Sequence, residues 1–370
     1  MQFTCEKNAL VNAVSIASRT VAQKSAIPAL EGILIRAGVK LSLSGYNLET
    51  GITISLDADI RETGSCIMPA RLFFDIIRKL PDDSVSIRVD EKFRVSIQGG
   101  ISSFTISAMS PEEYPELPEV ESDKGIRMPQ NELKAMIGGT SFAVSENQAR
   151  PIHTGCLFEV EDGSITVVAV DGYRLALRRW KAEEPIGRKL KFVVPAAALK
   201  EAEKILGDTD ESCAFYLGTK HILFTIGEAT LVCRLLEGEF LDWRRVLPKD
   251  QPIKLAINVA KMTDSIERVG LVISEKLKSP VRCRFGDNTA DFRSVSTIGE
   301  AHDVCSIAGD GQDMEIGFNC RYLLDALRAI PDAECSLELI NGLSPIVMNP
   351  CDGSEKYSYM VLPVRLKAGE

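Results

Sequence analysis

Three sequence elements recur along the chain at nearly the same spacing. They are Gly45-Tyr46-x-Leu48 with Gly172-Tyr173-x-Leu175 at an offset of 127, Pro28-x-x-x-Gly32 with Pro151-x-x-x-Gly155 at an offset of 123, and Pro69-Ala70 with Pro195-Ala196 at an offset of 126. A chain of 370 residues holds three such spacings, so the offsets predict three similar units in tandem. We expect domains at 1–122, 123–250 and 251–370.

Each unit shows the same order of helix, strands, helix and strands. Apolar residues at helical spacing predict helices at 6–24, 70–79, 130–143, 196–206, 258–275 and 319–330. Runs such as 85–89 and 164–170 are rich in β-formers or alternate apolar with polar residues, which is typical of antiparallel strands. The expected fold is α+β, with two helices packed on antiparallel sheets in each unit.

The composition indicates a reduced globular protein. Ten cysteines are scattered without a C-x-x-C pair and without histidine partners, a pattern that predicts neither a disulfide framework nor a zinc site. There is no apolar run long enough to cross a membrane and no N-terminal secretion signal. We therefore expect a cytoplasmic location, no membrane, no metal and no cofactor.

Charge is unevenly distributed between helices and the rest of the chain. The six predicted helices, with the fifth counted to residue 278, carry a net charge of +6, which leaves −15 elsewhere in a chain of net charge −9. This division fits helices that face a polyanion. It also fits basic residues that decorate solvated helix faces, and the count does not separate the two interpretations.

No conventional catalytic motif is present. The three histidines, His153, His221 and His302, lie far apart in the sequence without obvious partners, and the chain has no nucleophile elbow, metalloprotease motif or phosphate-binding loop. An enzyme acting through Asp171 and Arg174 remains an alternative, but Asp171-Gly172 is more typical of a turn.

Arginines beside apolar residues occur in three segments that the repeats do not share. They are Arg174, Trp243-Arg244-Arg245-Val246-Leu247, and Met360-Val361-Leu362-Pro363-Val364-Arg365. If the segments converge, they would form a groove for a short peptide, with apolar anchors and orienting arginines. The alternative is that they pack between domains. For Trp243-Arg244-Arg245 alone, stacking on bases and an exposed ion-paired loop are further possibilities.

The order of motifs resembles the bacterial DNA sliding clamps, the β subunits of DNA polymerase III holoenzyme. The residues that carry the resemblance are Ile27-Pro28, Pro69-Ala70-Arg71, Arg150-Pro151, Asp171-Gly172-Tyr173-Arg174-Leu175-Ala176, Arg244-Arg245-Val246-Leu247-Pro248 and Leu362-Pro363-Val364-Arg365-Leu366. The resemblance implies a non-catalytic processivity factor. It would be a head-to-tail homodimeric ring that encircles duplex DNA without sequence preference, is loaded by a clamp loader, and tethers the polymerase III catalytic subunit and other polymerases or repair proteins that carry clamp-binding peptides.

The resemblance also implies site residues. The implied peptide groove comprises His153, Val170, Gly172, Tyr173, Arg174, Leu175, Leu241, Arg245, Val246, Met360, Val361, Leu362, Pro363, Val364 and Arg365. The helices and the family's DNA-facing positions give seven cations as DNA-facing candidates, namely Lys24, Arg71, Arg78, Arg150, Lys200, Lys204 and Arg328.

Three groove positions depart from the family's pattern. His153 stands where leucine is usual, Leu241 where proline is usual, and Val170 where threonine is frequent. These departures bear on which peptides bind best. The segment 367–370 extends past the family's usual end. A peptide-binding scaffold that does not encircle DNA is the other hypothesis, and retention on circular DNA separates it from a clamp.

Overall fold

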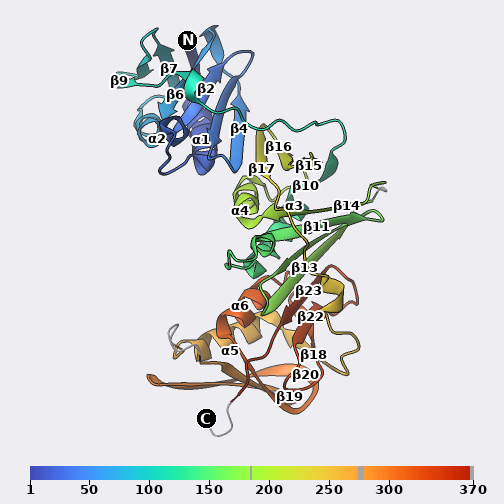
Figure 1. The fold of residues 1–370 in the computed structure, drawn as a ribbon. Coiled ribbons are helices and arrows are strands. Elements are labelled where there is room, and N and C mark those ends of the chain that lie inside the picture. The colour runs from blue at the N-terminus through green and yellow to red at the C-terminus, as the bar shows by residue number, and fades with distance from the viewer. Residues whose placement is uncertain (184–185, 274–278, 367–370) are drawn as a thin grey trace. The chain divides into compact units, whose positions relative to one another are not determined.

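The structure is a computed structural model that describes residues 1–183, 186–273 and 279–366. The described residues divide into two compact units. Unit 1 contains residues 1–134 and 201–235, and unit 2 contains residues 135–200 and 236–370. The middle third of the chain therefore contributes to both units, and Figure 1 follows this path in colour from blue to red.

Unit 1 contains two antiparallel sheets. The first has the order β5-β1-β7-β8-β9, with strands Asp59–Glu62, Gln2–Glu6, Ser84–Val89, Arg94–Gly99 and Ser102–Ser107. The second has the order β10-β15-β16-β17-β4-β3-β2-β6, with strands Ile126–Pro129, Ser212–Leu217, His221–Ile226, Ala229–Arg234, Thr50–Leu56, Leu41–Tyr46, Gly32–Ala37 and Gly64–Pro69. Strands β17 and β4 pair from Ala229 with Ile54 to Cys233 with Thr50, so one sheet joins the first and second repeats.

Unit 2 contains one ten-stranded sheet. Its order is β14-β11-β12-β13-β23-β22-β21-β18-β20-β19, with strands Leu190–Pro195, Gly155–Glu161, Ser164–Val170, Arg174–Lys181, Tyr357–Val361, Ile346–Pro350, Glu334–Leu339, Ile253–Asn258, Gly299–Phe318 and Val281–Ser296. Strands β13 and β23 pair from Arg174 with Val361 to Arg178 with Tyr357. That junction joins the second and third repeats in the same way as β17 and β4 join the first two.

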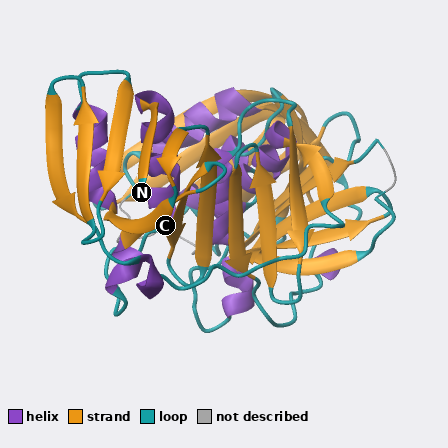
Figure 2. Ribbon diagram, turned by 90° about the horizontal axis from the view of Figure 1, so that it is seen from above, coloured by secondary structure: helices purple, strands orange, loops and turns teal. Residues whose placement is uncertain are grey.

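Six α-helices lie in the described parts of the chain. They are α1 (Lys7–Ala17), α2 (Ala70–Lys79), α3 (Gln130–Gly138), α4 (Ala196–Ile205), α5 (Val259–Gly270) and α6 (Cys320–Arg328). Figure 2 distinguishes these helices from the strands they cover. In unit 1, α1 packs on α2 and on β4, and in unit 2, α5 packs on α6 and on β20. Helices on antiparallel sheets confirm the expected α+β class, with three tandem repeats.

Several helices are shorter than predicted. The expected helix 6–24 ends as an α-helix at Ala17, because Ser18–Thr20 tighten into a 3-10 turn and the Thr20 hydroxyl donates to the Gly45 carbonyl at 2.9 Å. The helix expected at 258–275 ends at Gly270, and residues 274–278 lie outside the described residues. Leu72, expected to be buried on α2, is 49% exposed.

The periodicity missed several strands. These are β1, β5, β6, β10, β13, β14, β18, β19, β20 and β22. The longest omission is the β19–β20 hairpin, whose core positions Val281, Cys283 and Phe285 are buried at every second residue while charged residues occupy the exposed positions. The many charges in this stretch hide its apolar alternation, although the period of two is that of a strand.

Candidate functional site

A tight turn connects β12 to β13 in unit 2. The Asp171 carboxylate accepts from the backbone N–H groups of Tyr173 at 2.9 Å and Arg174 at 3.0 Å, and Gly172 adopts φ +89°. This is an Asx turn, in which the side chain caps the backbone and glycine supplies the left-handed conformation.

The same turn connects β3 to β4 in unit 1, but at a different offset from the one the sequence suggests. There the Asn47 side chain accepts from Glu49 and Thr50, and Leu48 has φ +73°. The pairs Tyr46–Gly51 and Val170–Leu175 close the two turns, so the structural offset is 124 and not 127. The Gly-Tyr-x-Leu match in the sequence therefore does not mark the turn that the two units share. Gly45 lies inside β3, and the residues with the shared capping role are Asn47 and Asp171.

Arg174 is buried beside this turn. Its guanidinium donates to Asp171 at 2.9 Å, to Asp325 of α6 at 2.6 Å and to the Phe142 carbonyl at 2.6 Å. The guanidinium carbon also lies 4.4 Å from the centre of the Tyr322 ring. Only 7% of Arg174 is exposed. Because these contacts already use its Nε and both terminal nitrogens, the geometry gives Arg174 a role in fixing the turn against α6.

Four of the predicted groove residues belong to one hydrophobic cluster. Val170, Leu175 and Met360 are buried in it, and Val246 packs on it partly exposed. Leu175 and Met360 are paired across β13 and β23, which brings residues 185 positions apart into contact. The cluster therefore forms an apolar floor from three separate chain segments, and of these four residues only Val246 is partly exposed. Val361, which follows Met360 on β23, is fully buried.

A hollow of about 670 Å³ opens over the turn. Its lining includes the predicted residues His153, Val170, Gly172, Tyr173, Arg174 and Leu241, together with residues 144–147, Asp171, Arg150, Arg321 and Tyr322. Tyr173 is 61% exposed, and its ring stacks on that of Tyr322 with centroids 5.9 Å apart. The structure thus brings six of the fifteen predicted groove residues to one hollow.

His153 faces this hollow without a partner for its Nε2 atom in the described residues. Its ring packs edge-on against Phe240, with centroids 5.1 Å apart. Burial, and then the charge of Arg150, lowers the pKa of the His153 imidazole below its ordinary value. His153 thus places an unpaired ring nitrogen beside the apolar floor. The leucine that is usual at this position in the family would offer no polar atom there.

The C-terminal residues continue from β23 past the turn. The Leu362 N–H donates to the Tyr173 carbonyl at 2.8 Å, and the Val364 N–H donates to the Gly317 carbonyl at 2.8 Å. Pro363 is half-buried, whereas Val364 and Arg365 are exposed. Residues 367–370 lie outside the described residues, so the structure places no part of that extension. Arg245, in the 3-10 turn η6 (Trp243–Arg245), is exposed and pairs with Asp242 at 3.0 Å.

The seven cations predicted to face DNA are all exposed, but their pairing differs. Three pair with carboxylates, Arg78 with Asp75, Lys204 with Glu201 and Arg328 with Glu267. Among the described residues, the other four form no ion pair, namely Lys24, Arg71, Arg150 and Lys200.

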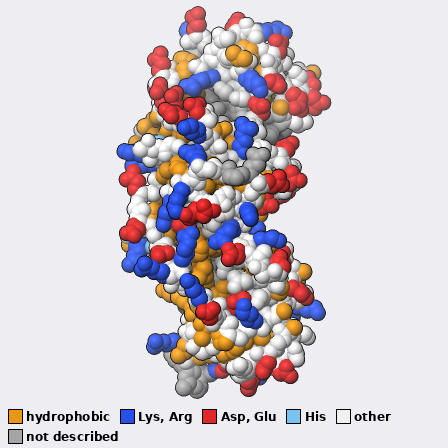
Figure 3. Space-filling model, turned by 90° about the vertical axis from the view of Figure 1, so that its right-hand side faces the viewer, with side chains coloured by type: hydrophobic (Ala, Val, Ile, Leu, Met, Phe, Trp, Pro, Cys, Tyr) orange, Lys and Arg blue, Asp and Glu red, His pale blue; other side chains and the backbone are white. Residues whose placement is uncertain are grey.

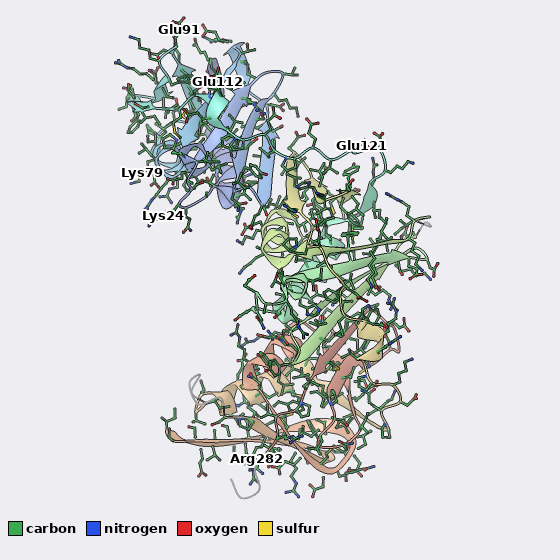
Figure 4. All side chains as sticks on the ribbon, viewed as in Figure 1. Lys24, Lys79, Glu91, Glu112, Glu121 and Arg282 are labelled. Atoms are coloured by element: carbon green, nitrogen blue, oxygen red, sulfur yellow. The ribbon has the colours of Figure 1, made fainter. Side chains whose placement is uncertain are left out.

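In unit 1 the free cations lie near the helices. Arg71 lines a hollow of about 730 Å³ between the α1–η1 segment and α2, where η1 is Ser18–Thr20. Figure 4 shows Lys24 and Lys79 on the helical side of unit 1, with Glu91 at its opposite end. Acidic and basic side chains are interspersed on the face drawn in Figure 3, and neither kind forms a continuous patch there.

The described residues contain no cluster of His, Cys, Asp or Glu that could hold a metal ion. Nor is any helix among them long and apolar enough to span a membrane. What unit 2 offers is an apolar floor, a rigid turn and a partly polar hollow, an arrangement suited to binding a short extended peptide. Sequence reasoning missed Phe142, Tyr322 and Asp325, which hold Arg174; an aromatic and an acid three residues apart on α6 were the available signal.

Tandem α+β repeats that share continuous sheets define the class of protein, a multidomain scaffold. Family models for the N-terminal, central and C-terminal domains of the DNA polymerase III beta subunit match residues 1–118, 127–242 and 244–365. The chain belongs to this family, that of the beta sliding clamps, and is thus a non-catalytic processivity factor of DNA polymerase.

Known relatives match along nearly their whole length. The beta sliding clamp of Staphylococcus epidermidis is 32% identical over 381 residues, with 99% of each chain covered. The structure of a putative DNA polymerase III beta subunit from Eubacterium rectale is 33% identical, with a TM-score of 0.93, and covers 98% of this chain and 99% of that chain. The Bacillus subtilis sliding clamp is 29% identical, with a TM-score of 0.94, covering 99% and 100%.

Proposed function

We propose that two copies of this chain close head to tail into a ring around duplex DNA. In a closed ring of six repeats, neither subunit keeps an unpaired interface. A head-to-tail contact is heterologous, and its two copies close the ring. The observation that carries the proposal is a pair of edge strands, β9 in unit 1 and β19 in unit 2, each of which ends its sheet. Two other edge strands are partly covered, since Ile67 of β6 bridges Met109 and Val193 of β14 bridges Leu236.

The exposed residues at these two edges support strand addition between subunits. Phe104 on β9 is 40% exposed and Val295 on β19 is 52% exposed. Leu271, which follows α5, is 81% exposed. Unpaired edge strands with apolar side chains invite pairing with another chain. The dimer would use β9 of one subunit and β19 of its partner.

DNA would be held by charge and topology without reading of bases. Lys24, Arg71, Arg150 and Lys200 are exposed and free to approach phosphates, and phosphate contacts carry no sequence information. Such contacts are weakened by salt, which permits sliding. The acidic remainder of the chain would disfavour DNA elsewhere on the surface.

The groove in unit 2 would receive clamp-binding peptides. Its apolar floor, formed by Val170, Leu175, Val246 and Met360, suits apolar side chains of an extended peptide. The partners would be the clamp loader, the polymerase III catalytic subunit, and other polymerases or repair proteins. All ten cysteines are free in the structure, which suits the reducing cytoplasm.

One experiment tests the ring. Solution mass is measured by light scattering at micromolar concentration, and the loaded protein is then followed on nicked circular DNA in high salt. We expect twice the subunit mass of 40.5 kDa, retention on the circle, and release when the DNA is linearised. A monomer that leaves circular DNA in salt would refute the ring. Peptide binding without retention would favour the scaffold alternative.

A further inference from the structure

A buried carboxylate lies beneath the segment that carries Arg245 and Val246. Glu159 on β11 is 8% exposed. Its Oε2 accepts a hydrogen bond from the Trp243 indole N–H at 3.1 Å and lies 2.8 Å from the Arg244 guanidinium. Its Oε1 lies 3.4 Å from the Lys191 ammonium. Two of the three partners are consecutive residues of η6, so this one carboxylate joins η6 to the sheet.

The rest of the segment is held by side-chain packing, with Phe240 buried in the hydrophobic cluster and Leu236 and Leu247 packed on it. Residues 236–252, all of them described, contain no strand and only one helical turn, η6. Within this turn the N–H groups of Val246 and Leu247 both donate to the Trp243 carbonyl, at 3.1 and 3.2 Å. Trp243 is 5% exposed in the hydrophobic cluster, and the Arg244 guanidinium carbon lies 4.2 Å from the centre of its ring. The position of Val246 therefore depends on that of Trp243.

The energetics favour a fixed arrangement. A buried carboxylate is stable only when charged or hydrogen-bonding partners surround it, and loss of one partner leaves an unsatisfied group. Any shift of η6 away from β11 would separate Glu159 from both Trp243 and Arg244. The penalty for that separation holds η6, and with it the Val246 part of the apolar floor, in one place.

We propose that Glu159 is a positioning residue of the peptide groove. It acts through the Trp243 indole to set the place of Val246 before any peptide arrives. Preorganisation of this kind raises affinity because the segment need not be ordered on binding. The proposal rests on the proposed function, since it assigns Glu159 to the same groove.

Peptide affinity of the full-length protein tests the proposal. The probe is a fluorescently labelled peptide with the clamp-binding segment of the polymerase III catalytic subunit, followed by anisotropy. We expect Glu159→Gln to weaken binding about tenfold, and Trp243→Phe, which keeps the ring and removes the N–H, to weaken it by a similar factor. Lys191→Gln, which removes the partner on Oε1, is the matched control and should leave affinity within about twofold.

The double variant distinguishes positioning from general damage. The double variant combines Glu159→Gln with Trp243→Phe. If Glu159 acts through Trp243, the double variant should bind the peptide no more weakly than the single variant of lower affinity. If the two residues act independently, the two losses of affinity would multiply. The chain has two tryptophans, so a Trp180→Phe background leaves Trp243 as the only emitter. In that background Glu159→Gln should shift the emission maximum without peptide, and Lys191→Gln should not.

The outcomes separate cleanly. Unchanged affinity in Glu159→Gln, with binding lost in Val246→Ala, would overturn the positioning role and leave the groove standing. Effects of Glu159→Gln and Trp243→Phe that multiply would also overturn it. Absence of peptide binding to the unaltered protein would overturn the proposed function, and this inference with it.

Discussion

Arg174 and Arg245 illustrate how two arginines from the same expected site differ in environment. Arg174 is 7% exposed between Asp171 and Asp325, whereas the Arg245 side chain is 87% exposed. Removal of Arg174 leaves the Asp171 carboxylate without its cation and leaves Asp325 only the more distant Arg321, at 3.9 Å. Breaking a buried pair in this way costs about 3–5 kcal/mol. Arg174→Ala should therefore lower the free energy of unfolding by about that amount in urea titrations.

Arg245→Ala serves as the control for that measurement. An exposed arginine contributes little to stability, so this variant should unfold within about 0.5 kcal/mol of the unaltered protein. It should instead weaken peptide binding, which would assign Arg245 to partner contact. Equal stability of the Arg174 and Arg245 variants would contradict the buried network.

His153 predicts a dependence of stability on pH. Burial, with Arg150 nearby, lowers the pKa of its imidazole below the ordinary 6.5. As the pH falls through 6.5, the unfolded chain takes up a proton that the folded chain refuses, so the free energy of unfolding falls. His153→Leu should lose this contribution. Urea midpoints at pH 7.5 and 5.5 should fall less in the variant, and an identical fall in both proteins would refute the assignment.

At the level of elements, the repeats were the most informative part of the sequence. Proline and glycine positions mark equivalent places in the first two repeats, because Gly32 and Gly155 both pair with prolines, Pro69 and Pro195, at the ends of matching strands. A Cβ at either glycine would approach a backbone carbonyl oxygen within 2.8 Å. Such close approaches constrain the residue type and so remain visible in sequence.

Other elements could not be predicted from local patterns. The pairing of Leu175 with Met360 depends on the order of strands in a sheet that spans two repeats, and no local periodicity encodes it. The same holds for Arg174, whose partners Phe142 and Asp325 are 32 and 151 positions away. The sequence distinguishes the three apolar-plus-arginine segments from the shared repeats, but the structural role of Arg174 is evident only when its tertiary neighbours are known.

The C-terminal strand sets the limits of a useful truncation. Met360 and Val361 are buried in β23, so deletion from Met360 would remove core residues as well as groove residues. Deletion of Pro363 to Glu370 preserves β23 and the Leu362–Tyr173 hydrogen bond. We expect this truncation to abolish binding of the labelled peptide while the solution mass stays that of the dimer. A monomer would reassign the tail to the subunit contact.

Gly317→Ala offers a milder test of the same element. A Cβ at Gly317 would lie 2.6 Å from Leu366 Cδ2 and 2.9 Å from the Val364 carbonyl oxygen, distances that real Cβ atoms do not tolerate. The tail would be displaced without being removed. Peptide affinity reduced in both variants would tie the loss to tail position, whereas full affinity in Gly317→Ala would show that the resting place of Val364 is irrelevant to binding.

At the scale of the whole molecule, the proposed ring would close through β9 and β19, each of which ends its sheet among the described residues. An added charge in the middle of such an edge blocks strand addition, because pairing would bury it, and an unpaired buried ion costs several kcal/mol. Phe104→Arg places a guanidinium at the centre of β9. We expect this variant to have the mass of one subunit, 40.5 kDa, and to be lost from circular DNA.

Ile101→Arg is the matched control, because Ile101 is fully exposed in the turn between β8 and β9 and outside both edge strands. It should remain dimeric and be retained on DNA. Both variants should bind the labelled peptide with unaltered affinity, since the groove lies in unit 2 and β9 in unit 1. A dimeric Phe104→Arg protein would remove β9 from the subunit contact. If both variants lose the dimer equally, the cause is general repulsion by the added charge. Loss of the dimer in Phe104→Arg alone assigns the subunit contact to the strand edge.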